Sequence, residues 1–89
     1  MNLYTKKGKP LQVKHKKVYD KSGKIIGQIK NDKVFGLNGK YVGTIVGDRL
    51  VYRASSAAYI NTPFSAPNTT GCMKANCLAS AIWGDELKI

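Results

Sequence analysis

The residues of this chain best placed to do chemistry are cations that recur at two fixed positions. A lysine follows a glycine at positions 9, 24 and 40, and a lysine or arginine precedes an apolar pair at positions 17, 33 and 49. Clustered lysines attract phosphate and other anions, even without a shaped pocket. The predicted anion-binding residues are these two sets and one further arginine: Lys9, Lys24, Lys40, Lys17, Lys33, Arg49 and Arg53.

The excess of positive over negative charge lies entirely in the first part of the chain. The 89-residue sequence has a formal net charge of +10. Residues 1–53 hold 13 of the 15 lysines and arginines against three aspartates, whereas residues 54–89 hold two residues of each sign. Such an excess raises the local concentration of anions. The expected partner is therefore a nucleic acid, a phosphorylated small molecule or an acidic protein surface.

Catalytic patterns are missing from the sequence. The single histidine, His15, lies between two lysines, and no nucleophile motif accompanies it. The three aspartates of the basic part lie in predicted turns, where carboxylates ordinarily cap the backbone. No phosphate-binding loop, dinucleotide fingerprint or cluster of metal ligands is recognisable. We therefore expect a protein that is not an enzyme and that has no catalytic residue, cofactor or metal.

The two cysteines, Cys72 and Cys77, are too few for a disulfide-rich secreted scaffold and lack the partners of a zinc site. Two free thiols and one incidental bridge both remain open. The sequence contains no apolar run of 18 residues and no charged-then-apolar leader. We therefore expect a soluble, cytoplasmic protein that does not bind a membrane.

The cations recur because the chain repeats itself. Residues 18–33 align without gaps on residues 34–49, with six identical positions. Residues 3–17 form a first copy that is one residue shorter, and residues 50–89 form a fourth copy with an insertion at about 54–81. The tail at 82–87 is similar to residues 45–50, which span the junction between the third and fourth copies. This periodicity predicts a single domain over 1–89, built from one small unit used four times.

Each copy is predicted to form a β-hairpin followed by a second tight turn. The start is apolar and aromatic, as in Val18-Tyr19, and a turn follows at 20–23 or at Asn38-Gly39. The next strand is predicted at 24–30 and at 40–46, and a second turn at 31–32 and 47–48. Alternation gives this strand a core face, which consists of Ile25, Gly27 and Ile29 in the second copy and of Tyr41, Gly43 and Ile45 in the third. Residues 73–82 are the one segment compatible with a short helix.

Four units with the pattern aromatic-D-x-x-G-K-aliphatic-aliphatic-G-x-I resemble the bacterial 4-fold β-flower domains. The resemblance is carried by residues 18–53, above all VFGLNGKYVGTIVGDRLVYR, and by the tail SAIWGDE. It implies a mainly β fold in which four hairpin repeats of about 16 residues surround a pseudo-fourfold axis. This chain departs from that pattern by a long irregular insertion in the last repeat. The family implies no catalytic residues. Other short β repeats, such as MORN-like or YD-type units, contain similar glycines and aromatic residues but repeat with a different period.

If the four units are related by a pseudo-fourfold rotation, equivalent lysines form rings around the axis. Three functions are then considered. The first is a non-enzymatic binding module with a basic face for nucleic acid. The second is a binder or sponge for a small, nucleotide-like phosphorylated ligand, which is compatible with a homo-oligomer. The third is a structural domain for protein–protein interaction. Alternatively, the lysines are solvated turn and edge residues that discourage aggregation.

The insertion is longer than most loops of compact domains. One interpretation is a strap that covers the open edge of the β structure with Tyr59, Ile60, Phe64 and Trp83. The other is a lid or a dimerisation arm.

Overall fold

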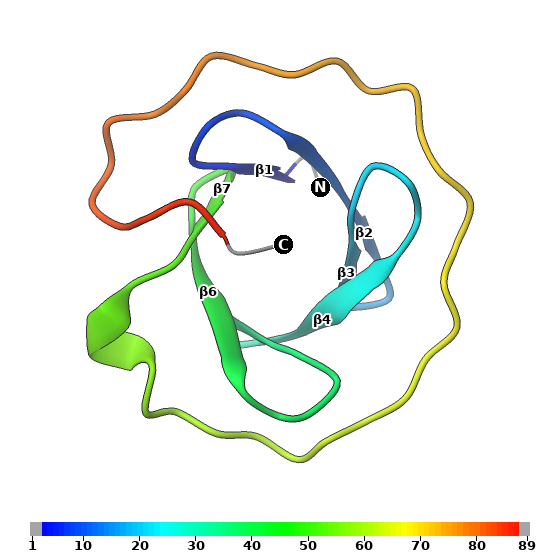
Figure 1. Cartoon of the computed structure of the whole chain (residues 1–89), viewed down its shortest axis with the longest axis vertical. Helices are drawn as coiled ribbons and strands as arrows, with labels where there is room; N and C mark the ends of the chain where they lie inside the picture. Colours follow the sequence, from blue (N-terminus) through cyan, green and yellow to red (C-terminus); the bar gives the residue numbers. More distant parts are fainter. Residues whose placement is uncertain (1–2, 88–89) are drawn as a thin grey trace.

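Seven short strands close into a barrel in the computed structural model, which describes residues 3–87 (Figure 1). The elements are β1 (Leu3–Thr5), β2 (Pro10–Lys14), β3 (Lys17–Tyr19), β4 (Ile25–Lys30), β5 (Lys33–Phe35), β6 (Tyr41–Val46), β7 (Arg49–Val51) and the 3₁₀ turn η1 (Ala54–Ser56). Consecutive strands pair antiparallel, and β1 pairs with β7 in parallel to close the barrel. The mainly β fold that the sequence predicts is confirmed.

The centre of the barrel is filled by the first residue of every repeat. Leu3, Val18, Val34 and Leu50 are completely buried, and Leu87 joins them from the C-terminal segment. Burying a side chain of this size contributes about 1.5–3 kcal/mol relative to leaving it exposed. Four equivalent residues therefore form one small core around the pseudo-fourfold axis.

A missing β-bulge explains why the first copy is one residue shorter. In the second copy, Val18 pairs with Gly27 and Tyr19 with Ile25, so the residue between those two partners is extra. The third copy has the same irregularity. In the first copy Leu3 pairs with Leu11 without any shift. The predicted core face is kept across the bulge, because Ile25, Gly27, Tyr41 and Gly43 are all buried.

The hairpin loops at 5–9, 20–24 and 36–40, here called the petal turns, have a fourth counterpart made by distant residues. In each petal turn the first N–H donates to the carbonyl of the last residue, at 2.8–2.9 Å. Tyr52 N–H donates to the Asp85 carbonyl in the same way, at 2.9 Å. Gly84, which precedes Asp85, has a positive φ like the petal-turn glycines. The tail therefore completes the fourth petal turn, and its predicted equivalence to residues 45–50 is wrong.

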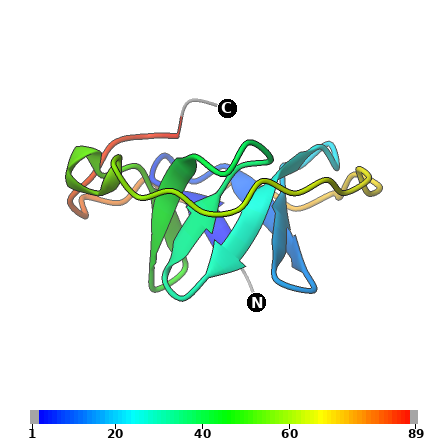
Figure 2. The same cartoon turned by 90° about the horizontal axis from the view of Figure 1, so that it is seen from below.

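The segment inserted into this fourth turn encircles the barrel. Residues 57–83, here called the strap, run around the outside as an extended chain (Figures 1 and 2). The N–H groups of Asn61, Thr69 and Cys77 donate to the carbonyls of the petal-turn glycines at positions 39, 23 and 8, at 2.8–2.9 Å. A second series, from Phe64, Cys72 and Ser80, reaches the residue two places before each glycine, at 2.8–3.0 Å. The strap therefore docks on one petal turn every eight residues, in the reverse order of the repeats.

Residues 73–82 form no helix, because the N–H groups of Cys77 and Ser80 donate to the first petal turn and not to carbonyls four residues earlier. The strap also covers no open sheet edge, since the barrel is closed. Three of the side chains expected to cover an edge, Tyr59, Ile60 and Trp83, are 55%, 78% and 64% exposed. The strap is held mainly by hydrogen bonds from its backbone to the petal turns.

Candidate anion-binding site

The two tight turns at 14–17 and 30–33 carry a lysine on each side. Lys14 pairs with Lys17 across β2 and β3, and Lys30 pairs with Lys33 across β4 and β5. Side chains alternate along a strand, so these four point outward while Val18 and Val34 face the core. The turns lie at the end of the barrel away from the C-terminus (Figure 2). We call Lys14, Lys17, Lys30 and Lys33 the basic rim.

Like charges directly opposite each other destabilise a β-ladder, and the basic rim contains two such pairs. Its one neighbouring carboxylate is Asp32, which lies 3.1 Å from the Lys33 ammonium. The third turn differs, since Val46 pairs with Arg49 and Asp48 lies 3.4 Å from that arginine. The repulsion is therefore concentrated on the strands β2 to β5.

Lys16 increases the imbalance because it occupies the position that an aspartate holds in the next two turns. The carbonyls of Lys16, Asp32 and Asp48 each accept an N–H of a neighbouring strand, at 2.7–2.8 Å, which shows their equivalence. The first turn thus has a cation where the others have a carboxylate. A pocket of about 450 Å³ lies beside it, lined by Lys16, Ile29, Lys30 and Asn31.

The turn at 14–17 also carries backbone strain. His15 and Lys16 have φ values of 51° and 63°, a left-handed conformation that costs residues other than glycine about 1–2 kcal/mol. Replacing the two by Asn-Gly, the preferred pair for a two-residue hairpin turn, is expected to stabilise the protein by about 1–2 kcal/mol. Urea unfolding of the double variant His15→Asn/Lys16→Gly measures this gain.

The variant Lys16→Gln is the control for that experiment, because it removes the charge and leaves the backbone constraint. An equal gain from Lys16→Gln would assign the strain to electrostatics, and no gain in the double variant would show that the turn is relaxed.

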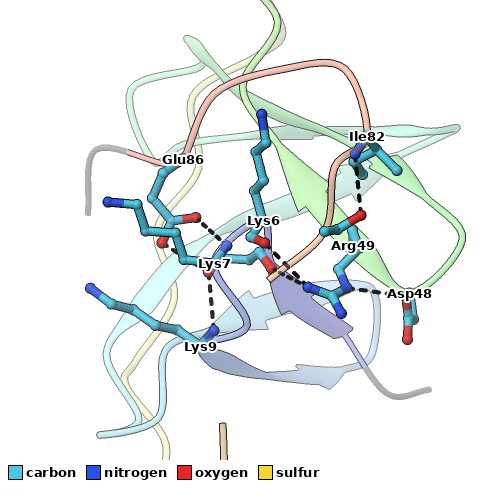
Figure 3. A network of polar contacts seen from close by, with 9 residues as sticks. Lys6, Lys7, Lys9, Asp48, Arg49, Ile82 and Glu86 are labelled. Atoms are coloured by element: carbon cyan, nitrogen blue, oxygen red, sulfur yellow. Dashed lines mark hydrogen bonds and ion pairs between the residues drawn. The ribbon is translucent and has the colours of Figure 1, made fainter. Parts of the chain in front are cut away.

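Arg49, a predicted anion ligand, is committed to closing the barrel (Figure 3). Its guanidinium donates to the carbonyls of Thr5 and Lys6, at 3.3 and 3.2 Å, and its side chain is only 14% exposed. These bonds join β7 to β1 across the parallel seam. Of the predicted set at 17, 33 and 49, the structure therefore brings only Lys17 and Lys33 together on the rim.

Sequence reasoning missed Lys14 and Lys30, the other half of the basic rim. A signal was present, because the spacing K-x-x-K occurs at 14–17 and again at 30–33, each time around a two-residue turn. Lysines on both sides of such a turn face each other across the hairpin.

The lysines that follow the petal-turn glycines are positioned by side-chain oxygens. The backbone N–H groups of Lys9, Lys24 and Lys40 donate to Thr5 Oγ1, Asp20 Oδ1 and Asn38 Oδ1, at 2.9–3.1 Å. All three lysines are exposed, and they lie on separate petals. Lys9 and Lys24 line different pockets, each of about 390 Å³ and each containing Asp20. The fourth equivalent position holds Asp85, so these residues do not form a uniformly cationic ring.

The Asp20 carboxylate stays ionised in this setting. Its partial burial alone would raise its pKa, but hydrogen bonds from the Ser22 hydroxyl and from the N–H of Lys24 favour the charged form and hold the pKa below its ordinary value. Asp20 therefore adds a negative charge to the two pockets that Lys9 and Lys24 line.

The C-terminal segment is fixed to the first petal turn by Glu86 (Figure 3). One of its carboxylate oxygens accepts the hydroxyl of the fully buried Thr5, at 2.9 Å, and the other accepts the Lys7 N–H, at 3.1 Å. The last predicted ligand, Arg53, donates to the Trp83 carbonyl at 3.2 Å.

Within residues 3–87, no group of three or more His, Cys, Asp or Glu side chains is arranged to hold a metal ion. Cys72 and Cys77 are free thiols. No helix of the described chain has the length and apolarity needed to cross a membrane.

Comparison with known proteins agrees with this architecture. Neither a curated protein nor a solved structure matches the chain. The family described as "4-fold beta flower protein" matches residues 1–71, which include all seven strands and half of the strap. Because the match covers most of the sequence, the chain belongs to the 4-fold beta flower protein family.

Proposed function

We propose that this chain is a non-catalytic binding module whose basic rim holds the phosphates of a nucleic acid. The observation that supports this proposal is the pairing of Lys14 with Lys17 and of Lys30 with Lys33. Opposed like charges destabilise a β-ladder, and a phosphate bound near each pair would offset the repulsion that Asp32, beside Lys33, offsets only in part. Binding is thus strengthened by a strain that exists before the ligand arrives.

The extent of the basic rim favours a polyanion over a single phosphate group. The rim spans four neighbouring strands, and strands lie about 4.8 Å apart, so its width is about 15 Å. A nucleic acid strand offers successive phosphates over such a distance. Lys16 and the exposed His15 extend the same surface at the first turn.

A second candidate is a small phosphorylated ligand, and the pocket beside Lys16 and Lys30 favours it. This pocket of about 450 Å³ lies within the size range of small-molecule sites. A mononucleotide held there would need only these two cations.

Fluorescence anisotropy of a labelled 12-nucleotide single-stranded DNA, titrated with the protein at several salt concentrations, tests the proposal. Four phosphate contacts predict that log K falls with log salt with a slope of about −3, since each contact contributes about −0.7. Absence of binding at about 50 mM salt, or an affinity that does not change up to about 200 mM, would overturn the proposal. A saturable thermal shift with a mononucleotide alone would favour the small-ligand alternative.

A further inference from the structure

Two residues face each other where the inserted segment begins and ends. These are Arg53, just before η1, and Trp83, the last residue of the strap. The Arg53 guanidinium lies 4.5 Å from the centre of the Trp83 ring, which is a cation–π contact. Arg53 Nε also donates to the Trp83 carbonyl, at 3.2 Å. Its backbone N–H donates to the Tyr41 hydroxyl, at 3.1 Å, and ties this residue to β6. The arginine is therefore held against one face of the indole.

Trp83 is nevertheless 64% exposed. Since the arginine covers one face, this exposure leaves the opposite face open to solvent. A pocket of about 310 Å³ adjoins it, and Lys6, Tyr52, Arg53 and Asp85 are among its lining residues. The Lys6 ammonium donates one hydrogen bond to the Gly84 carbonyl, and an ammonium carries two further donors.

We propose that Trp83 and Arg53 form a stacking site for one unpaired nucleobase, with Lys6 binding the adjacent phosphate. This proposal rests on the proposed function and deepens it, because a base that stacks on an aromatic ring must be free of its duplex partner. The module would then prefer single-stranded nucleic acid.

The surroundings of Trp83 favour a base over an apolar protein partner. The pocket brings two cations, Lys6 and Arg53, to the ring, and an apolar partner would have to desolvate both. The same cations suit a nucleotide, whose flat base stacks while its phosphate is neutralised. Asp85 also lines the pocket and repels phosphate, so the phosphate is expected next to Lys6 or Arg53.

The test uses the intrinsic fluorescence of Trp83, which is the single tryptophan of the chain. The 12-nucleotide single strand is expected to quench this emission as it binds, and a strand of equal length made of abasic sites is expected to bind without quenching. A duplex of the same sequence should bind through the rim and leave the emission unchanged. Quenching by the single strand alone supports the stacking site.

Substitutions test whether the affinity for the single strand depends on the Trp83 ring. Trp83→Ala is expected to weaken binding of the single strand about tenfold, within the range for the loss of one stacked base, while Trp83→Phe keeps most of the affinity. Met73→Ala is the control, because Met73 is also a large strap side chain and is 98% exposed. It should change the affinity little.

The outcomes separate the two proposals. Binding seen by anisotropy with unchanged tryptophan emission overturns the stacking site and leaves the basic rim. Equal losses in Trp83→Ala and Met73→Ala also overturn a specific site at Trp83. Absence of binding by both signals overturns the rim and the stacking site together.

Discussion

The double variant Lys17→Gln/Lys30→Gln is expected to bind single-stranded DNA about tenfold more weakly at about 100 mM salt, with a salt slope reduced by 1 to 2. The variant removes one lysine from each opposed pair of the basic rim. Its stability in urea should stay equal or rise, because both cross-strand repulsions disappear. Weaker binding by a protein that is no less stable separates a ligand site from a structural role.

The control for the rim is Lys21→Gln/Lys40→Gln, which removes the same charge from two exposed lysines of the petal turns. Anisotropy titrations of both variants at the same salt concentrations measure the difference. An equal loss of affinity in the control would mean that net charge alone drives binding and that the rim has no special part.

The repeat and its turns were predictable from sequence because they depend on local chemistry. A β-branched or aromatic start followed by a Gly-Lys pair identifies the hairpins at 18–30 and 34–46, and each is present. Val18 and Val34 are buried at equivalent places for the same reason. Such local patterns predict hairpins without any information about the rest of the fold.

The strap could not be predicted because it is held through groups that every residue possesses. Asn61, Thr69 and Cys77 make the same backbone hydrogen bond with unrelated side chains. One exception is Asn68, whose Oδ1 accepts the Ile25 N–H at 2.9 Å, and Asn76 follows it at the same eight-residue spacing. Two asparagines are too weak a signal against the helical tendency of residues 73–82.

The basic rim was predictable only in part because it depends on strand register. Equivalent positions in the repeats suggested Lys17 and Lys33, while the K-x-x-K spacing only hinted at their partners, whose opposition is fixed by the pairing of β2 with β3 and of β4 with β5. Arg49 was included for its position, yet β1 pairs with β7 there and provides carbonyls for its guanidinium. Closure of the barrel is a long-range event that no local pattern encodes.

The substitution Gly23→Ala is expected to destabilise the protein by about 3 kcal/mol and to release the strap from the second petal turn. Gly23 has a φ of 96°, which costs an alanine about 1–2 kcal/mol. A methyl group there would also overlap the carbonyl oxygen of Thr69, so the strap backbone must move. Urea unfolding measures the loss, and faster hydrogen exchange at the Thr69 and Cys72 amides reports the release.

Gly47→Ala separates the two causes of that loss. Gly47 has a φ of 60°, and no atom lies within 4 Å of the position that its methyl group would take. This variant therefore carries the conformational cost alone, about 1 kcal/mol, and should leave the exchange of the strap amides unchanged. Equal destabilisation by the two variants would mean that the strap yields without cost at Thr69. A larger loss of stability in Gly23→Ala, together with faster exchange at the Thr69 and Cys72 amides, would show that the petal-turn glycines let the strap dock. These glycines would then be the points at which the strap is attached to the barrel.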